Sequence, residues 1–271
     1  HSGSEIDKKR ANANIVMGRF LYALKQEADY EIISYEGGQK DNAITREAIC
    51  EILVAREDVE AVKASAAKAE DGLREEYAGT DGNITVQITE EGHAETDVLH
   101  PTSREKVLFY LVQIPFGIQK MSGNIEGLVE TSTNIGIVKL SDDEFFARSS
   151  VRSSVEVARD ALSDKIQYLT EFLGGEYEIQ GAYPAWEYRK DSPLRDKMVS
   201  VYEEMYGQKP EVVAIHAGLE CGLFYKKIEG LDCVSLGPNM KDIHTSEEVL
   251  DIASTERVWN YLVKVLEQLK D

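Results

Sequence analysis

Two histidines lie in short runs where metal or acid–base chemistry could take place. His244 belongs to the run GPNMKDIHT at residues 237–245, and His216 opens the run HAGLECG at residues 216–222. Imidazole is a good ligand for a borderline metal such as zinc, and it titrates near neutral pH. Each run follows a short apolar stretch, so each would leave the carboxyl end of a predicted strand, where ligands bind in open α/β sheets. His244 is therefore a candidate metal ligand.

Ordinary structural roles compete with both assignments. His244 could be simply the last loop residue before a helix that Ser246 caps. His216 and Glu220 have the i, i+4 spacing, which would allow coordination or a proton relay but is also common in helix-surface pairs. The glycines of the run would let the backbone approach a ligand closely. The residue types alone leave these alternatives open.

The run ARSSVRSSVE at residues 147–156 forms a second candidate site. On a strand, Arg148, Ser150 and Arg152 share one face, and the apolar residues share the other. The planar fork of arginine suits a carboxylate, so this polar face could hold an anionic group. The alternative is the solvent side of a half-buried sheet, which we prefer for Arg148. The apolar residues of the opposite face are Phe145, Ala147 and Val151.

The elements that would position these residues change in pattern near residue 184. Before it, helical and strand periodicities alternate irregularly, which predicts an α+β layer with an antiparallel hairpin at residues 134–140 and 145–151. The other elements expected there are helices at residues 6–27, 59–77 and 155–173 and strands at residues 30–35, 44–54, 84–88 and 177–182.

After residue 184, strands and helices alternate regularly, as in a parallel α/β sheet. Two strands cannot bury their faces alone, because a parallel sheet lies between helix layers and needs more strands. We therefore expect further strands upstream of this sequence. The expected elements are helices at residues 193–206, 219–227 and 255–269 and strands at residues 212–215 and 233–236.

Composition limits the partners and the compartment. The 271 residues carry 30 Lys and Arg against 49 Asp and Glu, a net charge of -19 that repels nucleic acid and anionic membrane surfaces. The longest apolar run, at residues 107–118, is interrupted by Gln113 and Pro115, so no membrane span or signal peptide is expected. Three cysteines without CxxC spacing favour free thiols in a reducing cytoplasm.

Several motifs together resemble a known family. They are HAGLECGLF, GPNMKDIHTSEE, the early runs HSG and RANAN, and ARSSVRSSVE. These runs resemble the aminoacyl-histidine (Xaa-His) dipeptidase branch of the dizinc M20-type metallopeptidases, which are related to carnosinases and desuccinylases. HAGLECG is highly specific, and the likeness extends over the whole chain. It implies a catalytic α/β domain with two zinc ions, or other divalent metals, and an inserted lid domain that helps bind substrate and dimerises.

The resemblance also implies a domain organisation. Residues 1–185 resemble the lid and residues 186–271 the C-terminal part of the catalytic domain. The expected fold class is thus α/β and α+β, with an antiparallel lid sheet and helices plus the C-terminal α/β portion of a zinc-peptidase domain. Relatives carry upstream a constellation of an HxD motif, a bridging Asp and a Glu-Glu pair, and this sequence contains no such constellation. We therefore expect a fragment that lacks the N-terminal half of the catalytic domain, binds no metal and is inactive alone.

The same resemblance implies functions for individual residues of the site. His244 is the expected metal ligand, and Arg152 would bind the C-terminal carboxylate of the substrate. His1 resembles a lid histidine that helps stabilise the oxyanion, although HSGS also resembles the remnant of an expression tag. Asn42 lies in a turn where Thr45 replaces the usual proline, which puts the turn geometry in doubt. The expected substrate-binding residues besides Arg152 are Asn42, Asn134, His216 and Glu220.

The sequence therefore predicts a cytoplasmic, zinc-dependent metallodipeptidase, a hydrolase that acts on dipeptides of the Xaa-His type. A homodimer is expected, without nucleic acid or membrane partners. One alternative is another dizinc amidohydrolase with the same lid, such as a tripeptidase or a deacylase. Only a dipeptidase should require a free amino terminus. The other alternative is a non-catalytic binding or dimerisation module that kept the scaffold.

Overall fold

The computed structural model describes residues 1–141, 143–213, 220–241 and 247–270, and it divides after Gly181 into two units. The first unit is His1–Gly181, and the described residues from Ala182 onward form the second. The division comes a few residues before the boundary expected at residue 185, and the roles of lid and catalytic portion stay predictions. Within the described residues, no helix combines the length and the apolar character that crossing a membrane requires.

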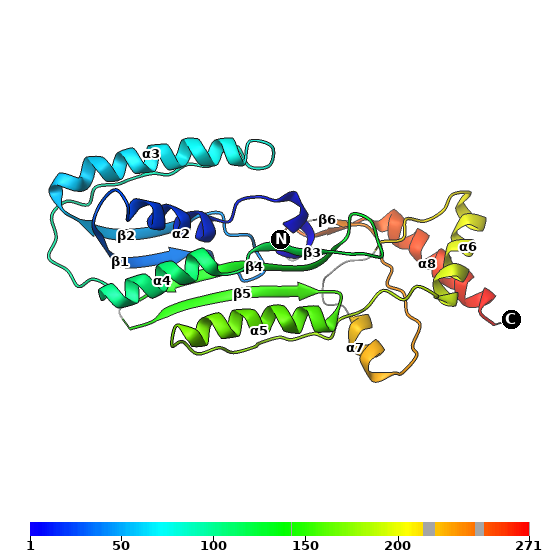
Figure 1. Cartoon of the computed structure of the whole chain (residues 1–271). Coiled ribbons are helices and arrows are strands. Elements are labelled where there is room, and N and C mark those ends of the chain that lie inside the picture. Colours follow the sequence, from blue (N-terminus) through cyan, green and yellow to red (C-terminus); the bar gives the residue numbers. More distant parts are fainter. Residues whose placement is uncertain (142, 214–219, 242–246, 271) are drawn as a thin grey trace. The chain divides into compact units, whose positions relative to one another are not determined.

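An antiparallel sheet organises the first unit, and β4 is its central strand (Figure 1). One edge of β4 pairs with β5 along most of its length. The other edge pairs with β3 at residues 129–133 and with β1 at residues 138–140. Between these two stretches, residues 134–137 have no strand partner on that edge among the described strands. The strands are β1 (Tyr30–Gly37), β2 (Ala48–Val54), β3 (Gly117–Met121), β4 (Val129–Leu140) and β5 (Phe145–Ser153).

Helices cover one face of this sheet and supply the core. Leu21 and Leu24 of one helix and Leu111 of another are fully buried in the same apolar cluster as Ile32 and Ile135 of the sheet. Burial of a side chain of this size contributes about 1.5–3 kcal/mol, so these contacts hold the layers together. The helices are α2 (Ala13–Leu24), α3 (Val59–Glu76), α4 (Pro101–Gln113) and α5 (Glu156–Phe172).

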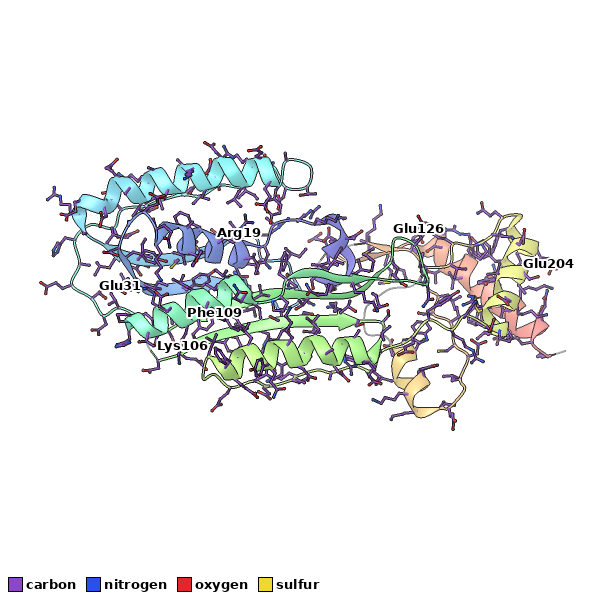
Figure 2. The ribbon with its side chains drawn as sticks, in the orientation of Figure 1. Arg19, Glu31, Lys106, Phe109, Glu126 and Glu204 are labelled. Atoms are coloured by element: carbon purple, nitrogen blue, oxygen red, sulfur yellow. The ribbon has the colours of Figure 1, made fainter. Side chains whose placement is uncertain are left out.

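An exposed ion pair links α2 to α3. Arg19, labelled in Figure 2, projects from α2, and its guanidinium binds both carboxylate oxygens of Glu76 at 3.0 and 2.7 Å. The pairing raises the pKa of Arg19 and lowers that of Glu76. Exposed pairs contribute at most about 1 kcal/mol, so the pair orients α3 more than it stabilises it.

The predicted helix at residues 6–27 is shorter in the structure, because Asn12 caps α2. Its side-chain oxygen accepts from the amide of Asn14 at 2.9 Å, so the helix begins at Ala13. The preceding residues form α1 (Ser2–Glu5) and the 3₁₀ turn η1 (Ile6–Lys8). These end at Lys9, which adopts the left-handed conformation with φ of 52°.

Two predicted strands do not form in this unit, whereas β3 and one helix form without having been predicted. Residues 84–88 and 177–182 form no strand. The amide of Val86 instead donates to Glu70 of α3 at 2.7 Å, so the first of these segments is bound by a helix and not by a strand. The helix α4 was not predicted, although Pro101 at its first position is a common start signal.

Gly72 offers a direct test of α3. It is exposed inside the helix, and an added β-carbon would meet nothing within 4 Å. Gly72→Ala should therefore raise the free energy of unfolding by up to about 1 kcal/mol, because glycine costs that much relative to alanine inside a helix. Urea denaturation followed by circular dichroism measures the change. A variant less stable than the unchanged protein would show that this helical turn is not formed.

In the second unit, α6 and α8 pack together through a small apolar cluster. Tyr261 donates its hydroxyl to the carbonyl of Met198 at 2.7 Å, and its ring meets that of Tyr202 edge-on with centroids 5.3 Å apart. The cluster also contains Val201 and Val265. The elements are α6 (Pro193–Tyr206), α7 (Glu220–Lys227), β6 (Met240–Lys241), β7 (Val249–Leu250) and α8 (Ile252–Gln268).

The parallel sheet predicted for this unit does not form among its described residues. Residues 212–213 and 233–236 are not strands, and residues 214–215 lie outside the described part. Val212 and Val213 are 53% and 67% exposed, so the apolar run that suggested a strand is not covered. A strand needs a neighbour to pair its backbone groups, and the described pairing here is the short antiparallel β6–β7 ladder. The wider prediction of a mixed α/β chain with an antiparallel sheet is confirmed.

Candidate functional site

The face of β4 and β5 that looks away from the core is polar. Ser132 lies opposite Arg152, and Asn134 lies opposite Ser150. The predicted division of β5 into two faces is confirmed, because its apolar residues Phe145, Ala147 and Val151 all pack against the core cluster. The polar face is therefore a separate surface from the apolar one that packs against the core.

Arg152 is half-buried on this face. Its Nε is buried and has no hydrogen-bond partner within the described part of the chain. Burial lowers the pKa of Arg152, and the charge of Asp41 acts in the opposite direction. An arginine stays protonated at any physiological pH, so a positive charge with an unused donor is held partly out of water. Such a group is suited to an anionic ligand.

Arg148 behaves differently, as expected from the sequence. It is exposed, donates to the side chain of Gln180 at 3.3 Å and lies 5.5 Å from the centre of the Phe146 ring. These contacts explain Arg148 as a surface residue of the strand.

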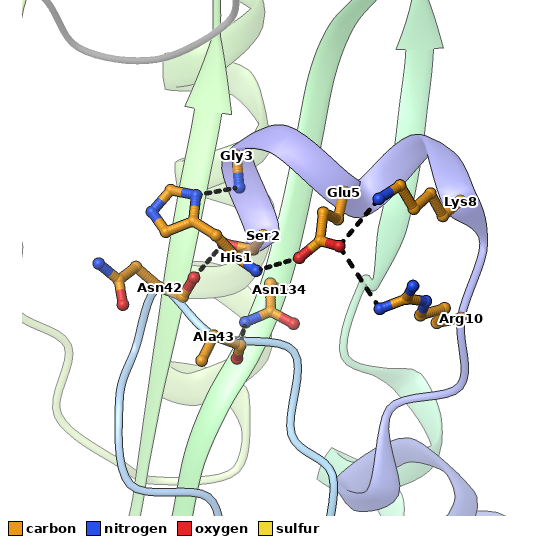
Figure 3. A network of polar contacts seen from close by, with 9 residues as sticks. All are labelled: His1, Ser2, Gly3, Glu5, Lys8, Arg10, Asn42, Ala43 and Asn134. Atoms are coloured by element: carbon orange, nitrogen blue, oxygen red, sulfur yellow. Dashed lines mark hydrogen bonds and ion pairs between the residues drawn. The ribbon is translucent and has the colours of Figure 1, made fainter. Parts of the chain in front are cut away.

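The imidazole of His1 and the guanidinium of Arg152 both border Gly3. A β-carbon placed on Gly3 would lie 2.9 Å from His1 Cε1 and 3.3 Å from Arg152 Cζ. His1 Nδ1 accepts from the Gly3 amide at 3.1 Å, as Figure 3 shows. The imidazole is thereby oriented, and Nε2 is the ring nitrogen left for another group. The structure thus brings together two predicted site residues, His1 and Arg152, from opposite ends of the first unit's sequence.

Asn42 contacts the same segment through its backbone. Its carbonyl accepts from the Ser2 amide at 2.8 Å and from the Ser2 hydroxyl at 3.0 Å. Ser2 is only 1% exposed, so these two bonds fix the residue that follows His1 in the chain (Figure 3). A contact between the Asn42 side chain and substrate stays a prediction.

Asn134 is buried, and its amide is occupied. Its Nδ2 donates to the carbonyls of Asp41 and Ala43 at 3.2 and 2.8 Å, and its Oδ1 accepts from Asn12 at 3.0 Å. Both amide hydrogens are therefore used to hold the backbone beside Asn42. Substrate contact by Asn134 stays a prediction, and the hydrogen bonds point to a role in holding the loop.

The remaining predicted site residues belong to the C-terminal part of the sequence. Glu220 is exposed at the first position of α7, whereas His216 and His244 lie outside the described residues. Gly222 was expected to let backbone approach a ligand. In the structure its β-carbon would lie 2.7 Å from the carbonyl of Pro184, so this glycine lets α7 pack closely against the chain.

Sequence reasoning missed the residues that place His1. Ser2 and Gly3 follow His1 in the HSG run and Asn12 lies in the RANAN run, but no role was predicted for these three residues. Two local signals were present: small residues next to a histidine, and an asparagine just before a predicted helix. The residues that Ser2 and Asn12 bind, Asn42 and Asn134, lie far away in the sequence.

The sequence motifs and the antiparallel sheet with its covering helices point to one class of protein. Residues 11–268 match the model of Peptidase family M20/M25/M40, and the chain belongs to this family.

Two dipeptidases are similar to the chain over nearly its whole length. The cytosol non-specific dipeptidase of Escherichia coli (strain K12) is 31% identical over 269 residues, which are 99% of this chain and 55% of that protein. The crystal structure of aminoacylhistidine dipeptidase from Vibrio alginolyticus matches with a TM-score of 0.87 and 32% identity, over 99% of this chain and 55% of that chain. The predicted resemblance is thereby confirmed, and the chain spans about half the length of these relatives.

Proposed function

We propose that this chain works in a metal-dependent dipeptidase of the cytoplasm, which hydrolyses short peptides including those of the Xaa-His type. Membership of the peptidase family and the names of the two similar dipeptidases support this proposal. The observation that carries it is the half-buried Arg152, whose Nε is buried without a partner among the described residues and whose guanidinium shares Gly3 as a neighbour with His1.

In this proposal Arg152 binds the C-terminal carboxylate of the peptide. His1 then faces the carbonyl of the bond to be cleaved, and a donor at Nε2 stabilises the negative charge that develops on its oxygen. In a dipeptide these two groups are separated by a single residue, about 3.8 Å along the chain. A carboxylate anchor beside the oxyanion donor therefore selects substrates with one residue after the cleaved bond.

The same geometry explains the choice among the enzyme alternatives. A tripeptide cleaved at its first bond would place a second residue between the two groups, which the close approach at Gly3 does not favour. An N-acyl amino acid has the same spacing as a dipeptide, so a deacylase is the stronger rival.

Peptidases of this family generally use metal ions, usually zinc. The described residues contain no group of three or more His, Cys, Asp or Glu side chains arranged to hold one. We propose His244 as the ligand that this chain contributes to a site for two zinc ions or other divalent metals, and a homodimer as the working assembly.

A substrate panel tests the proposal. The complete protein is purified from the cells that make it, supplied with zinc, and assayed with an Xaa-His dipeptide, N-acetylhistidine and an Xaa-Xaa-His tripeptide. We expect cleavage of the free dipeptide and little cleavage of the other two. Faster cleavage of N-acetylhistidine would identify a deacylase, and faster cleavage of the tripeptide a tripeptidase. Tight dipeptide binding without turnover would identify a binding module.

A further inference from the structure

The sheet is interrupted at the position where the candidate site is attached. Gly136 is an extra residue in β4, because Ile135 pairs with Ser149 and Ile137 pairs with the next residue of β5, Arg148. This bulge falls within residues 134–137, where the opposite edge of β4 has no partner among the described strands. The carbonyls of Ile135 and Gly136 would therefore lack a ladder partner at this edge, which is costly for buried backbone groups.

Three side chains replace the missing strand, and we name them the polar plug. Asn12 and Asn14 donate through Nδ2 to the carbonyl of Ile135 at 2.9 and 3.4 Å. The hydroxyl of Thr45 is directed at the carbonyl of Gly136 at 3.0 Å, with that of Ile135 at 3.2 Å. The plug residues are 1%, 0% and 3% exposed, so the plug is buried.

The members of the plug also bind one another and the core. Asn14 Nδ2 lies 3.2 Å from the Thr45 hydroxyl oxygen, and its Oδ1 accepts from the hydroxyl of Tyr35 at 3.1 Å. The carbonyl of Thr45 accepts from the Ala13 amide at 2.9 Å, which ties the plug to the start of α2. A buried polar network in which the groups satisfy each other permits few other arrangements.

A short loop, residues 40–45, crosses β4 at the bulge, and we name it the strap. A β-carbon on Gly136 would lie 2.4 Å from the carbonyl oxygen of Asp41, and one on Gly38 would lie 1.9 Å from that of Gly136. Gly38 also has φ of 79°, a conformation that glycine adopts without strain. Glycines at both positions thus allow the strap to lie directly on the strand, where Asn134 holds its carbonyls.

We propose that the polar plug is a positioning device for the site. Asn12, Asn14 and Thr45 do not themselves bind substrate. They hold the strap on β4, so that the carbonyl of Asn42 fixes Ser2 and keeps His1 beside Arg152. The use of this placement in hydrolysis rests on the proposed function, whereas the placement itself does not.

Apolar residues would fill the gap in the sheet, but they would leave two strand carbonyls without donors. A polar plug satisfies these carbonyls and also grips the strap, which apolar packing would not orient. The presence of three buried polar residues at this gap in the sheet is therefore explained if they hold the strap in one position.

Thr45→Val tests the device, because valine keeps the shape of threonine and removes its hydroxyl. The readouts are amide hydrogen exchange at Ser2 and Ala13 by NMR and the affinity for an Ala-His dipeptide. We expect exchange of these amides to become about tenfold faster and the dipeptide affinity to fall about fivefold, as the loss of one or two buried hydrogen bonds implies. Thr45→Ser keeps the hydroxyl and should restore both values.

Thr131→Val is the matched control. It also removes one buried hydroxyl from the sheet, the partner of Ser153 at 2.9 Å, but Thr131 lies on the opposite face of the strand from Ser132 and Arg152. It should leave exchange at Ser2 and the dipeptide affinity unchanged. Equal acceleration in both valine variants would mean general loosening and would overturn the proposal. So would faster exchange in Thr45→Val with an unchanged dipeptide affinity.

Failure of the proposed function gives a different result. If the unchanged protein binds no dipeptide, the proposed substrate is wrong. The exchange rates of Ser2 and Ala13 in the three variants then still decide whether the plug positions the strap, and unchanged rates in Thr45→Val would overturn that placement.

Discussion

Arg152→Ala is expected to weaken binding of Xaa-His dipeptides by about 10- to 100-fold. A hydrogen bond to a charged group contributes about 1.5–3 kcal/mol, which corresponds to this range of affinity. The effect should be at the upper end, because Arg152 is partly buried and a hydrogen bond to a charged group is stronger away from water. Isothermal titration calorimetry with an Ala-His dipeptide measures the change. The dipeptide affinity of Arg152→Lys should lie between those of the unchanged protein and Arg152→Ala, since lysine keeps the charge and loses the planar fork.

Arg148→Ala is the control for charge alone. Arg148 lies on the same face of β5, is exposed, and already bonds to Gln180. We expect an affinity within about twofold of the unchanged protein, because exposed charges contribute little. If both arginine variants lost affinity equally, the dipeptide would be attracted by the general charge of the face, and Arg152 would have no specific role.

Gly136→Ala is expected to lower the free energy of unfolding by about 1–3 kcal/mol, the usual cost of forcing an extra methyl group into a packed site. The new β-carbon would lie 2.4 Å from the Asp41 carbonyl oxygen and 2.5 Å from that of Lys40. The strap can retreat only by breaking its bonds to Asn134. We therefore also expect weaker dipeptide binding. Urea denaturation and calorimetric titration measure the two effects.

Gly123→Ala is the matched glycine control. Gly123 lies in the connection between β3 and β4, its φ is not positive, and an added β-carbon would meet nothing within 4 Å. Its stability should stay within about 0.5 kcal/mol of the unchanged protein. Equal stability and equal dipeptide affinity in the two alanine variants would contradict the close contact between the strap and β4.

Local signals were sufficient for several elements. The predicted helix at residues 193–206 coincides with α6, because Ser192 caps its start and Gly207 ends it in the left-handed conformation. The alternation along β5 correctly placed Arg152 on the polar face, since the side of a strand to which a side chain points follows from its position alone. Motif similarity then supplied the family, which the comparisons confirm.

Contacts between distant residues were beyond such reasoning. Thr45 attracted notice only because it replaces a proline usual in the resembled family, whereas in the structure its hydroxyl binds β4. Nothing near Thr45 in the sequence indicates a partner 91 residues away. The strand predicted at residues 233–236 was wrong for a related reason. A strand-like sequence forms a strand only where a neighbouring strand pairs with it.

The long separation between the plug and its strand also sets an order of events during protein synthesis. Asn12 bonds to Asn134, which is made 122 residues later. At 5–20 residues per second, a ribosome needs on the order of ten seconds to cover that distance. The His1 segment and α2 therefore leave the ribosome well before β4 exists, with Leu21 and Leu24 still lacking the strand residue Ile135 that later joins them in the core. The apolar side of α2 therefore stays without its sheet partner until β4 has been made.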